Sequence, residues 1–157
     1  MIIYINMNVL LHPEMYNINY VYFNDSIKNT VIENSNFIKI MFSNEDLYLN
    51  GIYLSIPLQN ITLEKYYNKH KCIIDTEINK NILNFLFKLE SNILDKYDNQ
   101  KIKKLIITNQ LKQGNIKLFI ENNKLETRYS KVDFVLKISG IWERDDEIGL
   151  TYKFIMI

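Results

Sequence analysis

The chain is short of the residues that usually cross-link or interrupt a fold. Its 157 residues include one cysteine, two prolines, four glycines and no alanine. With Cys72 alone, no intramolecular disulfide can form, so a reducing compartment is expected. Because proline and glycine are scarce, turns must be built from Asn, Asp and Ser. We therefore expect one continuous domain over residues 1–157, large enough to bury a core without cross-links.

Long hydrophobic runs are also missing. No stretch approaches the roughly 18 apolar residues that a membrane span needs. The N-terminal stretch MIIYINMNVLLHPEMY is apolar, but it lacks a basic region and a small-residue cleavage site. Asn6 and Asn8 also interrupt its apolar run. The sequence therefore predicts a soluble intracellular protein without a membrane partner.

Motifs for nucleotide hydrolysis, metal binding and nucleophilic catalysis are absent from the sequence. It contains no GxxxxGK[ST] or GxGxxG loop, whose glycines let backbone amides approach a phosphate. His12, His70 and Cys72 are too few to complete a four-ligand zinc site. Cys72 and Ser139 have no evident base to activate them as nucleophiles. We therefore predict that the protein is not an enzyme and needs no cofactor or metal.

One acidic cluster invites a catalytic interpretation. Glu143, Asp145, Asp146 and Glu147 directly follow the only tryptophan, Trp142. A two-carboxylate hydrolase or a magnesium nuclease needs acids that converge from separate strand ends, whereas these acids follow one another along a single turn. The pattern favours the charged tip of a β-hairpin, which also hinders edge-to-edge aggregation. Metal binding is the alternative.

The amino-acid composition indicates the base composition of the genome. Isoleucine, asparagine, lysine, tyrosine and phenylalanine, which are used heavily here, have AT-rich codons, whereas alanine needs GC-rich ones. The sequence therefore predicts an AT-rich genome, such as that of a large DNA virus, a protist or an AT-rich bacterium.

Most of the chain is predicted to form strands, because β-branched and aromatic residues are dense or alternate with polar ones. The clearest hairpin joins residues 36–42 to residues 47–58 through a turn at 43–46. Gly51 could allow a bulge in its second strand. Further strands are predicted over 4–11, 18–23, 104–108, 115–122, 133–143 and 148–157.

Residues 75–97 break this pattern. Their apolar residues recur at spacings of three and four, which predicts an amphipathic helix. Asp75 or Thr76 is its expected N-cap. Residues 63–71 favour a second, shorter helix over a loop. The order of elements predicts an α+β, strand-rich fold: an antiparallel sheet or a partly closed OB-like barrel with one packed amphipathic helix.

The net charge of +1 is unevenly distributed. Residues 61–120 carry a net charge of +5, against −3 for residues 1–60 and −1 for residues 121–157. The middle third is therefore where a polyanion would dock, and a solvated lysine-rich face is the alternative.

Two stretches of this middle third combine lysines with aromatic residues. Single-strand binding uses aromatic rings for base stacking and lysines for phosphates. KYYNKHK (65–71) has this composition, and KIKKLIITNQLKQGNIKLF (101–119) is rich in lysine. The predicted nucleic-acid-binding residues are Lys65, Tyr66, Tyr67, Lys69, Lys71, Lys101, Lys103, Lys104, Lys112 and Lys117.

The end of the chain, FVLKISGIWERDDEIGLTYKFIMI (134–157), resembles the closing hairpin of single-stranded DNA-binding proteins of the T7-phage type. It is also similar to small proteins of nucleocytoplasmic large DNA viruses. The resemblance covers about 24 residues and implies an oligonucleotide-binding barrel that acts in viral replication or recombination. The phage proteins end in an acidic tail, whereas this chain ends in YKFIMI. The matching positions are Gly140, Trp142, Gly149, Leu150, Tyr152 and Phe154.

The sequence therefore predicts a non-enzymatic protein that binds single-stranded nucleic acid, in the host cytoplasm or nucleus if it is viral. The alternative is a structural or assembly protein, such as a virion or scaffold subunit, without a nucleic-acid site. Homo-oligomers are compatible with either function.

Overall fold

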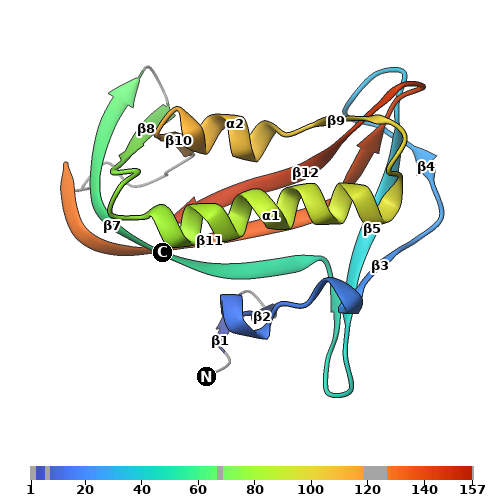
Figure 1. Cartoon of the computed structure of the whole chain (residues 1–157), viewed down its shortest axis with the longest axis horizontal. Helices are drawn as coiled ribbons and strands as arrows, with labels where there is room; N and C mark the ends of the chain where they lie inside the picture. Colours follow the sequence, from blue (N-terminus) through green and yellow to red (C-terminus); the bar gives the residue numbers. More distant parts are fainter. Residues whose placement is uncertain (1–2, 6–7, 67–68, 119–126, 157) are drawn as a thin grey trace.

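The computed structural model describes residues 3–5, 8–66, 69–118 and 127–156 (Figure 1). Two helices and twelve strands are assigned in these parts of the chain, with two short 3-10 helices near the N-terminus. The elements in chain order are β1 (Ile3–Ile5), β2 (Asn8–Leu10), η1 (Pro13–Met15), η2 (Ile18–Tyr20), β3 (Val21–Phe23), β4 (Ile27–Lys28), β5 (Asn36–Ser43), β6 (Tyr48–Asn50), β7 (Ile52–Tyr66), β8 (Lys69–Ile74), α1 (Lys80–Tyr97), β9 (Ile102–Lys104), α2 (Ile106–Lys112), β10 (Asn115–Leu118), β11 (Arg128–Glu143) and β12 (Glu147–Met156).

The strands form an open, mainly antiparallel sheet built around the long strand β11. The strand order is β10-β8-β7-β11-β12-β9, and β5 pairs with β11 beyond the end of β7. Only the β12–β9 ladder is parallel among the described pairs. The strand-rich antiparallel sheet is therefore confirmed. The OB-like barrel is not supported, because the described ladders leave β10 and β9 at the two ends of an open order.

Gly51 explains how β5 and β7 share one edge of β11. The predicted hairpin forms, with β6 returning beside β5, but the return strand is interrupted after Asn50. At Gly51 the backbone takes φ +94°, a conformation that favours glycine. The chain then leaves β5 and pairs with β11 from Ile52 onward. The predicted bulge is in fact a change of partner strand.

The predictions for two segments, one before and one after the main helix in the sequence, were wrong. In the range 63–71, predicted as a helix, residues 63–66 belong to β7 and residues 69–71 to the antiparallel β8, and residues 67–68 lie outside the described part. Residues 104–108, predicted as a strand, mostly form the start of α2, whose buried Ile107 and Leu111 are one helical turn apart. A short apolar run does not distinguish the two conformations, and tertiary packing decides between them.

The N-terminal strands are also more broken than predicted. The range 4–11 contains the β1–β2 hairpin, and residues 6–7 lie outside the described part. The range 18–23 begins with η2, where Asn17 Oδ1 accepts a hydrogen bond from the backbone N–H of Asn19 at 2.9 Å, and only then becomes β3. The predicted strand 115–122 is confirmed over 115–118, and the rest of that range lies outside the described residues.

The predicted amphipathic helix is confirmed as α1, but it starts later than expected. Asp75 caps a turn and not the helix, because its Oδ1 accepts from the backbone N–H groups of Glu77 and Ile78 at 3.1 Å. These bonds hold the pKa of the Asp75 carboxyl below its usual value. The helix itself begins at Lys80, and the second helix of the structure, α2, lies where a strand was predicted.

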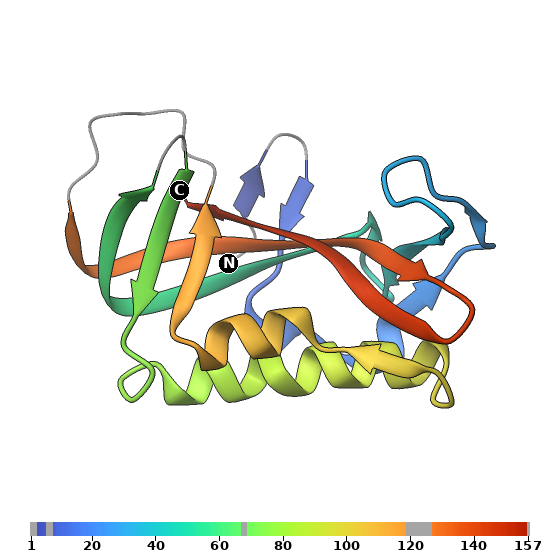
Figure 2. The ribbon, with the colours of Figure 1, turned by 90° about the horizontal axis from the view of Figure 1, so that it is seen from above.

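Both helices cover one face of the sheet (Figure 2). Leu86, Leu89 and Ile93 of α1 belong to one buried cluster with Leu54 of β7 and Leu136 of β11. None of the described helices is long and apolar enough to span a lipid bilayer.

A buried acid fixes α2 to α1. Glu90 is fully buried on α1, and its carboxylate accepts the backbone N–H groups of Ile107 at 2.9 Å and Thr108 at 2.7 Å. These donors lie in the first turn of α2, which has no side-chain cap of its own. Glu90 therefore acts as the N-terminal cap of another helix, where a negative charge is favourable.

Candidate nucleic-acid interface

Four of the predicted lysines meet at the end of the sheet formed by β7, β8 and β10. They surround a hollow of about 630 Å³, which we call the basic hollow. Figure 1 shows these strands on the left, at the far end of the sheet from the β11–β12 turn. The lining residues are Glu64, Lys65, Lys69, His70, Lys71, Gln113, Asn115 and Lys117.

The strand register explains why this end is basic. Lys71 of β8 is paired with Glu64 of β7 on one side and with Lys117 of β10 on the other. Side chains of directly paired residues lie on the same face, and like charges placed opposite each other destabilise a sheet. The Lys71–Lys117 pair therefore favours an anionic ligand, which would relieve the repulsion.

A left-handed backbone conformation at Asn60, within β7, brings these side chains to the surface. Before Asn60, the even-numbered residues Leu54 and Leu58 of β7 are buried; after it, the odd-numbered Ile61 and Leu63 are buried instead. Asn60 has φ +56° and so reverses the alternation. The reversal buries Leu63 and leaves Glu64 exposed in the same row as the two lysines.

His70 lines the hollow and has one ring nitrogen without a hydrogen-bond partner among the described residues. This nitrogen, Nδ1, is buried. A buried polar atom without a partner is costly in a folded protein.

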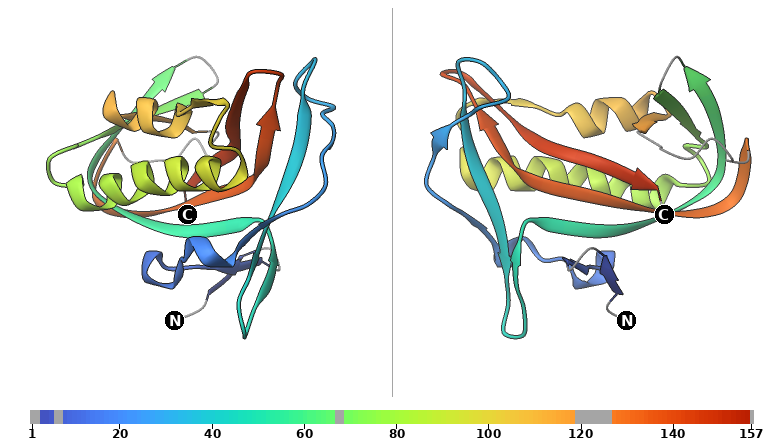
Figure 3. Two further views of the ribbon diagram at one scale, coloured as in Figure 1. Left: turned by 45° about the vertical axis from the view of Figure 1, so that its right-hand side comes forward. Right: turned by 180° about the vertical axis from the view of Figure 1, so that it is seen from behind.

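Three other predicted lysines belong to residues 101–104, a segment that lies beside the β11–β12 turn at the opposite end of the sheet (Figure 3). Lys101 is 2.9 Å from Glu143 Oε2, and Lys104 is 3.5 Å from Glu147 Oε2. Lys103 contacts Asp95 of α1. These lysines are paired with carboxylates and do not extend the basic hollow.

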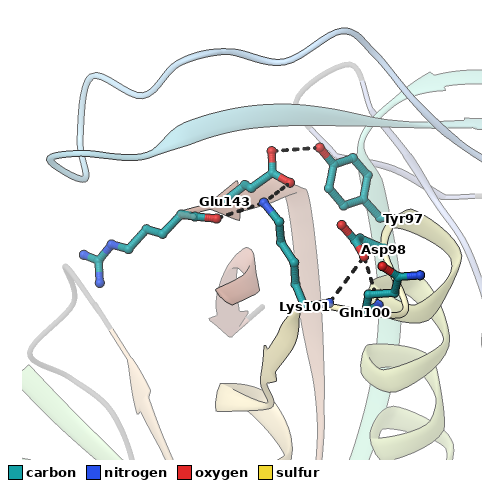
Figure 4. Close-up of polar contacts among 6 residues, drawn as sticks. Tyr97, Asp98, Gln100, Lys101 and Glu143 are labelled. Carbon is teal, nitrogen blue, oxygen red and sulfur yellow. Dashed lines mark hydrogen bonds and ion pairs between the residues drawn. The ribbon is translucent and has the colours of Figure 1, made fainter. Parts of the chain in front are cut away.

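Figure 4 shows how Glu143 links helix α1 to this turn. Its Oε1 accepts a hydrogen bond from the Tyr97 hydroxyl at 3.0 Å, and Lys101 Nζ also donates to the carbonyl oxygen of Arg144 at 3.0 Å. Burial and then this bond to Glu143 raise the pKa of Tyr97 to about 12. Asp98 accepts the backbone N–H groups of Gln100 and Lys101 and shapes the adjoining loop.

The acidic cluster is confirmed as the tip of a hairpin. Residues 144–146 connect β11 to β12, and Arg144 Nη1 donates to Glu147 Oε1 at 3.2 Å. Within the described parts of the chain, no three His, Cys, Asp or Glu side chains gather as a metal site would require.

The remaining predicted residues are dispersed. Lys112 lies on α2, with its Nζ 5.5 Å from the centre of the Phe87 ring of α1. Tyr67 and the side chain of Tyr66 lie outside the described residues. Conversely, Glu64, Gln113 and Asn115 line the hollow but were not among the predicted residues. Only their alternation with buried neighbours could have indicated their place there.

Buried thiol and phenol groups should make the folded state less stable at alkaline pH. Burial raises the pKa of Cys72 to about 12, and burial followed by the charge of Glu90 raises that of Tyr152 to about 12. The unfolded chain ionises these groups at lower pH. Their contribution to stability is therefore complete below about pH 9 and is lost as the pH rises toward 12.

We expect the free energy of unfolding, measured by urea denaturation, to fall between pH 9 and 11. The expected fall is about 1.4 kcal/mol per pH unit for each proton released on unfolding. Tyr152→Phe should make the fall shallower, since this variant removes one titrating group. An unfolding free energy that stays constant over this pH range would contradict the prediction.

No family model, curated protein or solved structure matches this chain. The resemblance of its closing hairpin to phage single-stranded DNA-binding proteins therefore stays a prediction from the sequence.

Proposed function

We propose that the chain binds single-stranded nucleic acid through the basic hollow, as a binding protein and not as an enzyme. The observation that carries the proposal is the row Glu64–Lys71–Lys117, in which two lysines face each other across β8 and β10 beside the further cations Lys65 and Lys69. Such a row can bind successive phosphates, because a flexible single strand can follow the curved end of the sheet. The resemblance of the closing hairpin would place this binding in replication or recombination.

The test is the salt dependence of binding to a fluorescent oligothymidylate, measured by anisotropy. For single strands, each phosphate contact contributes about −0.7 to the slope of log K against log salt. Replacing Lys71 and Lys117 together by Gln should lower the affinity at low salt about tenfold and make the slope shallower by about 1.4.

The matched control replaces Lys80 and Lys88 by Gln. Both lysines are exposed on α1, and neither lines the basic hollow. This control removes the same charge from the protein, so it separates a local contact from a general electrostatic effect. Equal losses in the two double variants, or no binding of the wild-type protein at low salt, would overturn the proposal.

A further inference from the structure

The face of the sheet opposite α1 carries a second surface, which the sequence analysis did not identify. Paired residues on neighbouring antiparallel strands point to the same side, so the registers define rows across this face. One row runs across four strands from Ile27 through Phe37 and Trp142 to Gly149. We call this row and the two beside it the outer platform.

Two glycines allow aromatic rings to lie close against the platform. A Cβ atom at Gly149 would be 2.4 Å from the Trp142 ring, and one at Gly140 would be 2.6 Å from the Phe37 ring. Both rings therefore occupy space that any larger residue would fill. Phe37 remains partly exposed, whereas Trp142, its neighbour in the row, is almost fully buried.

The other two rows of the platform carry its charge. The second row is Lys39, Gly140 and Thr151, and the third is Tyr53, Lys137 and Lys153. In the third row, Lys137 Nζ lies 5.6 Å from the centre of the Tyr53 ring. Beside the first row, Arg144 lies over the Trp142 ring at 5.7 Å.

The three rows together contain three lysines and three aromatic residues but no carboxylate. Lys137 and Lys153 are directly opposite each other on β11 and β12. Such a like-charged pair weakens a sheet, and no described acid within the rows compensates for it. The platform therefore has the charge that complements a phosphate backbone.

An apolar hollow of about 290 Å³ opens beside Phe37 and Thr151. Its walls include Ile27 and Val31, which are 61% and 89% exposed, and Lys28. Figure 2 shows β4 and the loop after it rising from the sheet on the side opposite α1. The volume is at the lower limit of the about 300–1,000 Å³ typical of small-ligand sites, which suits one flat ring better than a larger ligand.

We propose that the outer platform binds the bases of single-stranded nucleic acid. One unpaired base enters the apolar hollow and stacks on Phe37, another stacks on Tyr53, and the phosphates between them contact Lys39 and Lys153. Aromatic stacking tolerates any base, because every base presents a flat π-face. This inference rests on the proposed function and assigns a separate task to each surface: the basic hollow contacts phosphates and the platform contacts bases.

The test compares a normal oligonucleotide with an abasic one of equal length, which keeps the phosphates and lacks the bases. Trp142 is the only tryptophan, and it is the neighbour of Phe37 in the first row, so its fluorescence reports on the platform. The normal oligonucleotide should quench Trp142 and bind about tenfold more tightly than the abasic one.

Two variants separate a lost contact from a lost fold. Phe37→Leu keeps an apolar side chain but removes the ring, and should abolish the preference for the normal oligonucleotide while abasic binding stays unchanged. Lys153→Glu removes the repulsion from Lys137, so it should raise the melting temperature while it weakens oligonucleotide binding. Tyr48→Phe, at an exposed position on β6, is the control and should leave both affinities unchanged.

The results distinguish this inference from the proposed function. If the abasic oligonucleotide binds as tightly as the normal one, and Phe37→Leu has no effect while Lys71→Gln/Lys117→Gln still weakens binding, the platform inference fails and the basic hollow stands. If neither oligonucleotide binds at low salt, the proposed function fails, and the inference that rests on it fails with it.

Discussion

Replacing Gly140 by alanine should destabilise the protein strongly. A Cβ atom at this position would lie 2.3 Å from the carbonyl oxygen of Ile38, and a backbone atom of β5 cannot move aside as a flexible side chain could. Overpacking of a core commonly costs about 1–3 kcal/mol, and we expect at least the upper end of that range because β5 must separate from β11.

Urea unfolding followed by circular dichroism measures this loss, and hydrogen exchange should show that β5 loses protection first. Thr151→Ala is the matched control. Thr151 is paired with Gly140 in the same row, and its shortened side chain removes atoms without creating a clash. The explanation is wrong if Gly140→Ala is as stable as Thr151→Ala.

The second large effect is expected for Glu90→Gln. The carboxylate accepts one backbone N–H with each oxygen, whereas an amide has a single acceptor and would direct its own NH₂ group at the other donor. Hydrogen bonds to charged groups contribute about 1.5–3 kcal/mol, and the loss of negative charge at the start of α2 adds to the cost. We therefore expect the free energy of unfolding to fall by about 2–4 kcal/mol.

Glu77→Gln provides the comparison, since Glu77 is an exposed glutamate shortly before α1. It changes the same functional group in solvent and should alter the stability little. Faster hydrogen exchange in α2 than in α1 would locate the effect of Glu90→Gln at the capped helix. Similar unfolding free energies for the two variants would contradict the capping role.

The parts of the fold that the sequence predicted are those with long, regular periodicity. The stripe of α1 and the alternation in β5 and in the β11–β12 hairpin each cover enough residues to specify one conformation. Residues 63–71 and 104–108 are shorter and mixed in composition. Their conformation depends on partners distant in sequence, which a local pattern does not contain.

The same distinction applies to the candidate sites. Lys65, Lys69, Lys71 and Lys117 could be selected by charge and clustering, because three of them lie within one hairpin. The ion pairs of Lys101, Lys103 and Lys104 could not be foreseen, since each partner is brought close only by the fold.

The buried role of Glu90 and the outer platform were missed for a related reason. Glu90 follows Leu86 by four residues and precedes Ile93 by three, so its position on the apolar stripe was visible, but its backbone partners on α2 were not. The platform combines residues of several strands, and only the registers show that Phe37 and Trp142 share a row.

The central place of β11 has a consequence for synthesis of the chain. β5 and β7 are made early, but their common partner follows only after both helices, as the pairs Ile38–Ile141 and Ile52–Ile138 show. These partners are 103 and 86 residues apart, so at about 5–20 residues per second the later strand follows on the order of 4–20 s after the earlier one. During that time the nascent strands lack their partner, so chaperone dependence and slow refolding should be properties of this topology, independent of its final stability.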